Sequence, residues 1–220
     1  MTIKKVEVGH YSIPLPVILS DSMHGDMSGF ELMTVRVSDV EGREGLGYTY
    51  TLGAGARAIH SVMEADMVPF LLGRDETRIE EIWQSLWWKL HYAGRGGLAI
   101  HALSAIDVAL WDLLGKRTDL PLWRLLGGSN PEVKAYAGGI DLMFTLDELL
   151  AQTEKNLSKG FRAIKMKVGR DNLYEDVERI GAMRSHLGVN FPLMVDANMR
   201  WTVDEAIRAA RAFRKFDLVW

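Results

Sequence analysis

Two lysines separated by a single residue, Lys165 and Lys167, are the feature of this sequence that most directly suggests catalytic chemistry. They lie in the short apolar run 163–169, which is typical of a buried strand. Side chains alternate across a strand, so both ammonium groups are expected on the same side. Ammonium groups this close repel each other, so one binds its proton less tightly and can act as a general base. The simpler alternative is a pair of solvated surface lysines, since this spacing is common.

A second apolar run, residues 193–195, ends in Asp196, and Asn198 follows two residues later. A carboxylate at a strand end can bind Mg²⁺, which completes its octahedral shell with water and substrate oxygens. The alternative is that Asp196 caps the loop before Thr202 and that Asn198 is a turn residue. Two lysines facing a carboxylate at neighbouring strand ends predict an acid/base and metal site.

The elements that must position these residues alternate between strand and helix from about residue 131. Capping boxes of Thr145 with Glu148 and of Thr202 with Glu205 indicate two helix starts. Strand–helix units of about 30 residues predict parallel strands with crossover helices, in either a (β/α)₈ barrel or an open doubly wound sheet. Barrel active sites lie at the carboxyl ends of the strands. The expected strands are 133–139, 161–167, 193–196 and 217–220, and the expected helices are 145–160, 171–187 and 202–215.

Residues 1–130 predict a separate α+β domain, with strands first and helices after. A first strand from Ile3 is expected to stop at Pro14 and Pro16, followed by a polar loop at 18–29. Runs 32–37 and 45–50 predict a hairpin. Helices are expected up to about Met67, over 79–90, and over the nearly all-apolar run 99–114, with Gly115 as its C-cap.

Composition excludes several classes of protein. The 220 residues carry a net charge of −3, which provides no basic field for nucleic acid. The absence of cysteine excludes disulfides and cysteine-bound zinc and fits a reducing compartment, so we expect a cytoplasmic protein. The N-terminus lacks the apolar core of a signal peptide. We also expect no membrane partner, because no run looks long and apolar enough to span a bilayer.

The histidines show no metal-ligand spacing. His24, in the polar N-terminal loop, could reach a ligand, and the alternative is a plain surface histidine. Four tryptophans lie on the predicted helices: Trp83, Trp87, Trp88 and Trp111. Tryptophans in helices favour core or subunit contacts over a stacking platform for a ligand, so we expect a homo-oligomer.

Four sequence blocks occur in order along the chain: AIDVALWDLLGK at 105–116, PLWRLLGG at 121–128, KMKVG at 165–169 and VDAN at 195–198. Together they resemble the mandelate racemase/muconate lactonising branch of the enolase superfamily, and the similarity covers the whole chain. The resemblance implies an α+β capping domain over residues 1–130. Residues 131–220 would then be the first strands and helices of a modified TIM (β/α) barrel. Four strands cannot close an eight-stranded barrel of about 250 residues, so the chain is expected to be the N-terminal part of a longer protein.

The resemblance also implies roles for the site residues. Lys167 would be the base that faces the α-carbon of a small carboxylic-acid substrate, and Lys165 would tune it and contact the carboxylate. Asp196 would be the first of three Mg²⁺ ligands, with Asn198 beside the substrate. Loops around 18–29 and 48–55 would close over the site, and they carry His24 and Tyr50 as candidate substrate contacts.

The chemistry implied by this resemblance is abstraction of the proton α to a carboxylate, through an enediolate that magnesium stabilises. Residues 14–21, 45–50 and 93–98 are similar to galactarate/talarate-type dehydratases, so dehydration of an acid sugar, an aldarate or aldonate, is the first hypothesis. The alternatives are a racemase or epimerase of a 2-hydroxy acid, a lactonising cycloisomerase, or a non-catalytic scaffold. The remaining metal ligands and the opposing base would lie beyond Trp220, so we expect the 220-residue segment alone to be inactive.

Overall fold

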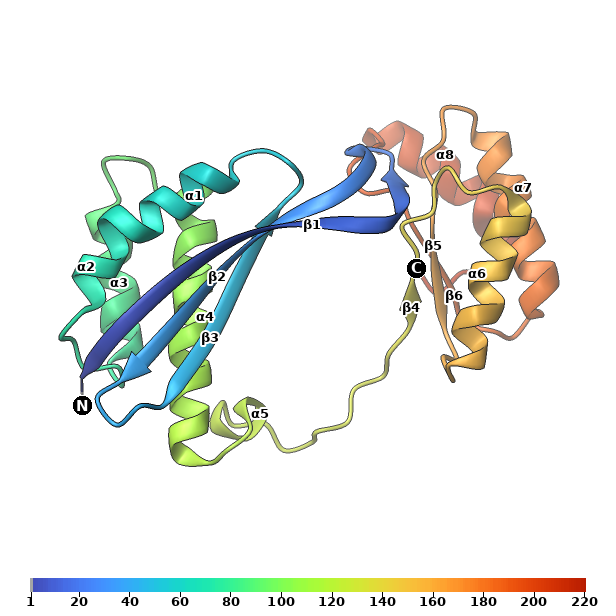
Figure 1. Cartoon of the computed structure of the whole chain (residues 1–220). Coiled ribbons are helices and arrows are strands. Elements are labelled where there is room, and N and C mark those ends of the chain that lie inside the picture. Colours follow the sequence, from blue (N-terminus) through green and yellow to red (C-terminus); the bar gives the residue numbers. More distant parts are fainter. Residues whose placement is uncertain (1) are drawn as a thin grey trace. The chain divides into compact units, whose positions relative to one another are not determined.

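The structure is a computed structural model that describes residues 2–220, and its chain divides into two compact units (Figure 1). Unit 1 comprises the residues up to Pro14 together with Gly29–Pro131. Unit 2 comprises Leu15–Ser28 together with Glu132–Trp220. The predicted division at residue 130 did not include this return of residues 15–28 to the second unit.

The sheet that begins the chain contains β1 (Ile3–Asp21), β2 (Gly25–Asp39) and β3 (Glu44–Thr51), in that order. Strands β2 and β3 are antiparallel, with Val35 opposite Gly47, which confirms the predicted hairpin. Asp39 shapes the turn between them, because its Oδ1 accepts hydrogen bonds from the backbone N–H groups of Glu41 and Arg43 at 2.8 and 2.9 Å.

The predicted end of the first strand was wrong. Strand β1 passes through Pro14 and Pro16 and ends at Asp21. Proline removes a backbone donor but is tolerated in a strand where that donor is not needed by a neighbour. The predicted polar loop at 18–29 is therefore mostly strand, with a short turn at residues 22–24 before β2. Polarity identified an exposed hairpin tip and not a loop.

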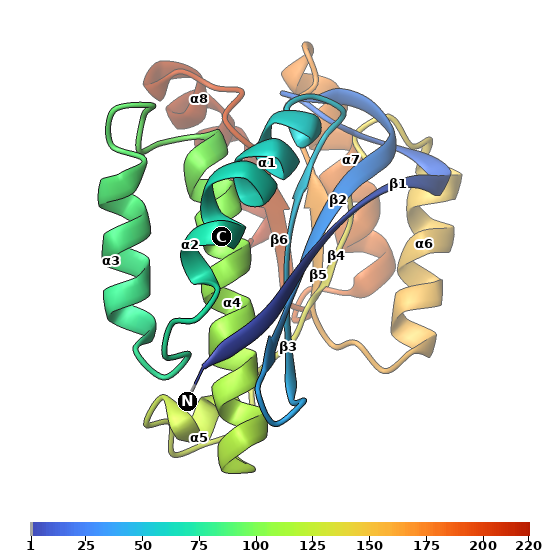
Figure 2. The same cartoon turned by 60° about the vertical axis from the view of Figure 1, so that its left-hand side comes forward.

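The helices of unit 1 pack on one another and on β3. The longest, α4, lies along β3 (Figure 2). This approach requires glycine, because a Cβ at Gly45 or Gly47 would lie 2.0 Å from the Ala109 oxygen or 1.9 Å from the Ala105 oxygen. The helices are α1 (Ala56–Val62), the π-helical turn η1 (Met63–Met67), α2 (Val68–Leu71), α3 (Ile79–Lys89), α4 (Leu98–Thr118) and α5 (Leu122–Leu125).

Helix α4 departs from two expectations. It continues through Gly115 to Thr118 and is capped by Asp119 in the left-handed region, with φ of 53°. By length and composition it is also apolar enough to cross a membrane, contrary to the sequence prediction. That is weak evidence for a membrane span, because one side of α4 forms part of the unit 1 core, including Ala102, Ile106 and Leu113.

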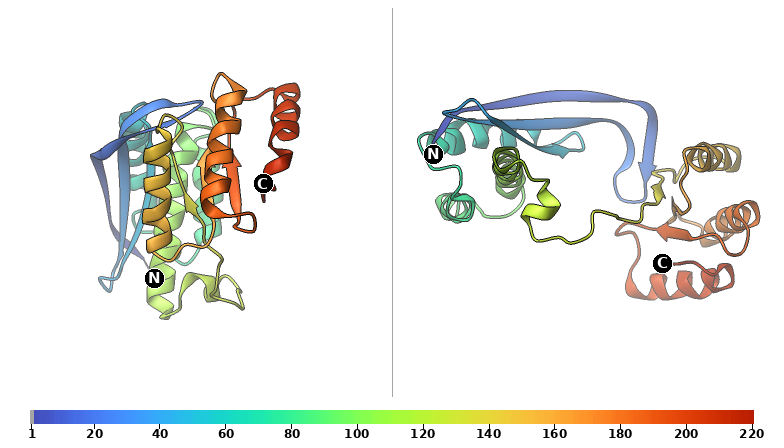
Figure 3. Two further views of the ribbon diagram at one scale, coloured as in Figure 1. Left: turned by 90° about the vertical axis from the view of Figure 1, so that its right-hand side faces the viewer. Right: turned by 90° about the horizontal axis from the view of Figure 1, so that it is seen from below.

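Unit 2 contains a parallel sheet with the order β4 (Ala137–Gly138), β5 (Ile164–Lys167) and β6 (Leu193–Asp196). Its helices are α6 (Leu146–Ser158), α7 (Leu173–Leu187) and α8 (Val203–Phe213), followed by the 3₁₀ turn η2 (Arg214–Phe216). These helices lie on one face of the sheet (Figure 3). A doubly wound sheet has helices on both faces, so the arrangement is that of a barrel wall.

Local signals in unit 2 were predicted well. Both capping boxes are present, at Thr145 with Glu148 and at Thr202 with Glu205. The expected strand at 217–220 is represented by two backbone hydrogen bonds of 3.0 Å on the edge of β6. They join Val219 N–H to the Leu193 oxygen and Val195 N–H to the Trp220 oxygen. The first strand of this unit is much shorter than the predicted 133–139.

Candidate functional site

Strand register brings the predicted lysines and carboxylate together. Lys167 on β5 is paired with Asp196 on β6. Its Nζ lies 2.6 Å from the Asp196 Oδ2, and the Lys165 Nζ lies 3.6 Å from the same oxygen. Both lysines are buried, with 8% and 6% of Lys165 and Lys167 exposed, so they are not solvated surface residues.

Asn198 completes this group. Its Oδ1 accepts a 2.7 Å hydrogen bond from the Lys167 Nζ, and its backbone N–H donates to the Asp196 Oδ1 at 2.8 Å. Asn198 has a φ of 53°, a conformation that asparagine tolerates better than most residues. Asp196 therefore shapes the loop after β6 with one oxygen and faces the lysines with the other, and its role as a metal ligand stays a prediction.

Burial and charge set the ionisation of the group. Burial, followed by repulsion from Lys167, lowers the pKa of Lys165. Burial alone would raise the pKa of Asp196, but the hydrogen bonds from Lys167 and from the Asn198 N–H outweigh it and lower that pKa. Asp196 is thus a carboxylate at neutral pH, and Lys165 is a lysine whose charged form is destabilised.

His24 lies on the hairpin tip of unit 2. The Asp21 carboxylate accepts hydrogen bonds from the His24 backbone N–H at 2.7 Å and contacts its Nδ1 at 2.9 Å. Burial would raise the pKa of Asp21, but these hydrogen bonds lower it. Ser22 ties the tip to the residue after Asp196, because its Oγ donates to the Ala197 oxygen at 2.6 Å. The imidazole is therefore oriented and partly exposed on a segment joined to the strand ends.

Tyr50 belongs to the predicted hairpin strand and not to the loop that was expected at 48–55. It lies on β3 opposite Leu32, and its ring meets Phe30 edge-on at 5.7 Å. The side chain is exposed. Tyr50 belongs to unit 1 and the lysines to unit 2, so its role as a substrate contact stays a prediction.

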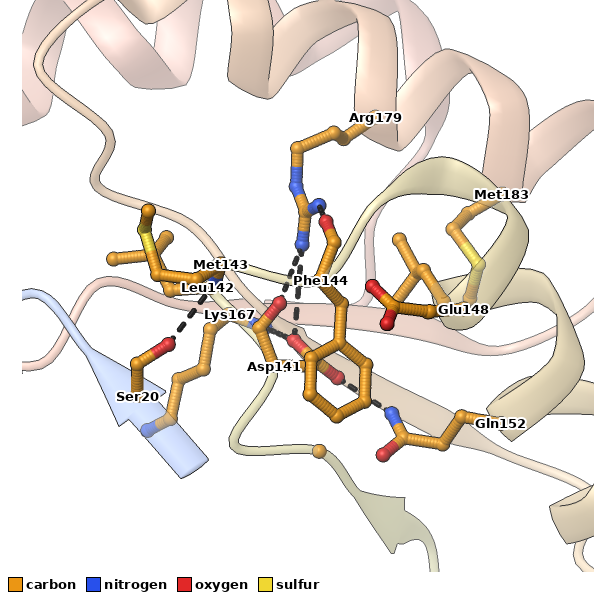
Figure 4. A network of polar contacts seen from close by, with 12 residues as sticks. Ser20, Asp141, Leu142, Met143, Phe144, Glu148, Gln152, Lys167, Arg179 and Met183 are labelled. Atoms are coloured by element: carbon orange, nitrogen blue, oxygen red, sulfur yellow. Dashed lines mark hydrogen bonds and ion pairs between the residues drawn. The ribbon is translucent and has the colours of Figure 1, made fainter. Parts of the chain in front are cut away.

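Sequence reasoning missed Asp141, which stands just after β4. Its carboxylate is fully buried and accepts hydrogen bonds from the Lys167 backbone N–H at 2.8 Å and the Gln152 Nε2 at 2.7 Å (Figure 4). Arg179 from α7 lies 3.9 Å from the same carboxylate. One signal could have found it, because Asp141 follows a predicted strand just as Asp196 ends one. The prediction of a strand at 133–139 did not consider the residues that come after it.

An open cavity of about 360 Å³ lies within unit 2 beside the ends of the strands. It is lined by the hairpin tip and by the loops that follow the strands, including Ser22, Gly169 and Arg200. Neither lysine lines this cavity.

The donor set fits one ligand of a magnesium ion. Asp196 supplies a carboxylate oxygen, the donor type that Mg²⁺ prefers, and magnesium sites often use only one or two carboxylates. Residues 2–220 contain no group of three or more histidine, cysteine or acidic side chains that could hold a metal. The described chain thus provides part of a metal site and not a complete one.

Residues 5–127 match the family described as mandelate racemase/muconate lactonizing enzyme, N-terminal domain. Residues 148–220 match the family described as enolase C-terminal domain-like. The chain belongs to the mandelate racemase/muconate lactonizing enzyme family of the enolase superfamily. Its fold is accordingly the α+β capping domain followed by the first part of the TIM barrel, which confirms the expected fold class.

Two relatives and one solved structure illustrate the likeness. The chain is 58% identical over 218 residues to a 3,6-anhydro-alpha-L-galactonate cycloisomerase of Streptomyces coelicolor, covering 99% of this chain and 60% of the relative. It is 37% identical to an L-talarate/galactarate dehydratase of Salmonella typhimurium, covering 94% of this chain and 54% of the relative. A racemase from Streptomyces coelicolor with bound magnesium superposes with a TM-score of 0.97 at 58% identity, covering 99% of this chain and 61% of that one.

These comparisons support the expected enzyme class and the expected cofactor, Mg²⁺. The chain spans about 60% of the length of the first of these relatives and 54% of the second. The activity and partners of the whole protein are therefore proposals, and the homo-oligomer, the cytoplasmic location and the absence of nucleic-acid or membrane partners stay predictions.

Proposed function

We propose that the protein carrying this chain abstracts the proton α to the carboxylate of a sugar acid, with Lys167 as the base and Asp196 as one magnesium ligand. The observation that carries this proposal is the pair formed by the Lys167 Nζ and the Asp196 Oδ2, 2.6 Å apart at the carboxyl ends of neighbouring parallel strands. Active sites of barrel enzymes form at this end of the strands.

Each group in the site would have a separate role in the proposed reaction. Bound magnesium would stabilise the negative charge that develops on the substrate carboxylate. Lys167, in its neutral form, would take the α-proton on Nζ. Lys165 would contact the substrate carboxylate, and its burial near a second ammonium makes an incoming negative charge favourable there. Asn198 would orient a substrate oxygen through its amide.

The step after proton removal is a β-elimination in both reactions that the relatives suggest. In an open-chain sugar acid, the bond from C3 to its hydroxyl breaks, the electron pair leaves with oxygen, and water is lost. In a 3,6-anhydro acid, the oxygen on C3 is also bonded to C6, so the same cleavage opens the ring. The freed oxygen stays on C6 and takes up a proton, so no mass is lost. Either way the enol that remains becomes a 2-keto-3-deoxy acid.

We favour the ring-opening reaction on a 3,6-anhydro sugar acid, because the cycloisomerase relative is 58% identical and the dehydratase relative 37%. The sequence alone favoured dehydration, which remains the second candidate on the strength of the latter likeness. A racemase would return the proton to C2 without elimination.

The test is an assay of the protein that carries this chain, with Mg²⁺ and a set of 3,6-anhydro and open-chain sugar acids in D₂O. Formation of a 2-keto-3-deoxy acid of unchanged mass, apart from deuterium, supports ring opening, and loss of water supports dehydration. Deuterium at C2 without elimination would instead indicate racemisation. No reaction and no exchange with any acid would refute the proposal.

Replacement of the base separates an enzyme from a scaffold. Lys167→Ala should lower kcat about 10²–10⁴-fold, the usual contribution of general acid–base catalysis. His186→Ala is a suitable control, because His186 is on α7 and pairs with Glu154 on the protein surface. Equal activity of the Lys167→Ala protein and the parent would exclude Lys167 as the base.

A further inference from the structure

The hydrogen-bond ladder between β4 and β5 is interrupted beside the lysines. Up to Gly139 it is regular, with 2.9 Å bonds from Ala137 N–H to the Ala163 oxygen and from Gly139 N–H to the Lys165 oxygen. Bonds in a parallel ladder are evenly spaced, so the next should run from Lys167 N–H to the Gly139 oxygen.

Two different bonds replace that one. The Gly139 oxygen accepts from the Lys165 Nζ at 2.7 Å, and the Lys167 N–H donates to the Asp141 Oδ1 at 2.8 Å. Residues 139–141 thus divide their acceptors between the two lysines. A carbonyl oxygen can accept two hydrogen bonds, so a continued ladder would make the Lys167 N–H and the Lys165 ammonium share the Gly139 oxygen. Here each of these two donors has an acceptor of its own.

Asp141 is anchored from two helices (Figure 4). Gln152 on α6 donates to its Oδ2 at 2.7 Å. Arg179 on α7 donates to the backbone oxygens of Asp141 at 2.9 Å and Phe144 at 2.5 Å. Both Asp141 and Arg179 are buried, so solvent competes little with these bonds. The Asp141 carboxylate that accepts from the Lys167 N–H is therefore held in a fixed position by α6 and α7.

The backbone around Asp141 is fixed as well. Ser20 forms an isolated parallel bridge with Asp141, through bonds from Ser20 N–H to the Ile140 oxygen and from Leu142 N–H to the Ser20 oxygen. The side chain folds back over Gly139, where a Cβ would lie only 1.6 Å from the Asp141 Oδ2. Only glycine at position 139 leaves room for this arrangement.

We propose that Asp141 is a positioning residue for the lysine pair: it holds the Lys167 backbone and leaves the Gly139 carbonyl to Lys165, so that both ammonium groups reach the same oxygen of Asp196. The inference rests on the proposed function, in which these lysines meet the substrate. Misplacement of a reacting group by about 1 Å can cost about 10²-fold in rate, so such a device matters to catalysis.

The experiment compares Asp141→Leu with Asp141→Asn in the protein that carries this chain. The leucine and asparagine side chains are similar in shape, but only asparagine keeps an oxygen that accepts from the Lys167 N–H. The Gln152 amide would then rotate so that its oxygen accepts from the asparagine NH₂ group. Asp141→Leu should speed hydrogen exchange at the Lys167 amide at least tenfold and lower kcat about 10²-fold with little change in KM. Asp141→Asn should restore most of both.

Asp39→Asn and Asp39→Leu are the matched controls. Asp39 is equally buried and also accepts from backbone amides, but it belongs to unit 1. These controls should lose thermal stability and keep both kcat and the Lys167 exchange rate. Gln152→Leu removes only one anchor and should raise exchange at Lys167 by a few fold, which keeps the test decisive if Asp141→Leu does not fold.

Parent-like exchange at Lys167 and parent-like kcat in folded Asp141→Leu would overturn the proposal. Parent-like exchange in Gln152→Leu would overturn the anchoring by α6. Faster exchange with unchanged kcat would reduce Asp141 to a structural residue and also overturn it. If the parent protein turns over no sugar acid, the proposed function fails, whereas the exchange measurement still reports separately whether Asp141 holds Lys167.

Discussion

Asp141 and Asp196 stand at the ends of the two strands that flank β5, yet their surroundings differ sharply. The Asp141 side chain is 1% exposed and that of Asp196 is 34% exposed. The Asp141 carboxylate is bound by a backbone N–H and a side-chain amide, and the facing oxygen of Asp196 pairs with the ammonium groups of the two lysines. A fully buried carboxylate with a backbone N–H and an amide as its donors organises its neighbours, whereas a partly exposed carboxylate that faces two ammonium groups has an oxygen suited to a metal ion.

The largest effect is expected from replacing Asp196, the more exposed of the two aspartates. Asp196→Asn should lower kcat about 10³-fold, since loss of metal-based charge stabilisation costs several kcal/mol. It should also weaken Mg²⁺ binding, measured by calorimetry, with little loss of thermal stability. Asp141→Asn, in contrast, should leave the affinity for Mg²⁺ unchanged. Equal Mg²⁺ affinity in the Asp196→Asn protein and the parent would remove Asp196 from the metal site.

Breaking the anchor of Asp141 should mainly affect stability. Arg179→Met leaves a buried carboxylate without its cation, and removal of one partner of a buried pair typically costs about 3–5 kcal/mol. Arg200→Met is the control, because Arg200 pairs with the largely exposed Asp171 and should change stability by less than about 1 kcal/mol. Chemical denaturation measures both. Similar losses in the two variants would contradict the buried role of Arg179.

Two adjacent glycines provide a smaller and sharper test. Gly139→Ala should cost about 1–3 kcal/mol, because the new methyl group displaces the Asp141 carboxylate. Gly138→Ala should be nearly neutral, because the nearest atom to a Cβ there is the Lys165 Cε at 3.6 Å, an ordinary contact. Exchange at the Lys167 amide should rise in the first variant only. An equal response in both would argue against close packing of Asp141 over Gly139.

The smallest expected effect is a pH dependence of stability from Lys165. Burial and then repulsion from Lys167 lower the pKa of Lys165 in the folded state below its ordinary value of 10.5. The unfolded chain therefore binds the proton more tightly, and folding becomes more favourable as pH rises from the folded pKa to the unfolded one. The parent should gain stability relative to Lys165→Met over that alkaline range, in denaturation series at several pH values. If the free energies of unfolding of the two proteins changed in parallel with pH, the protonation of Lys165 would not be coupled to folding.

Features that depend on near neighbours could be predicted from the amino-acid sequence alone. Side-chain alternation placed Lys165 and Lys167 on one side of a strand, and capping boxes placed the starts of α6 and α8. The strand ending at Asp196 was also predicted correctly, because its apolar run has sharp polar limits.

Features that depend on partners distant in the chain become visible only in the folded protein. Strand β1 continues past Pro14 and Pro16, although proline predicts an end. Asp141 reaches Lys167, 26 residues away, and Arg179, 38 residues away, and no periodicity within a short window contains such pairs. A side chain's role is set by which donors fold around it, so two aspartates that look alike in sequence became an internal anchor at Asp141 and a candidate metal ligand at Asp196.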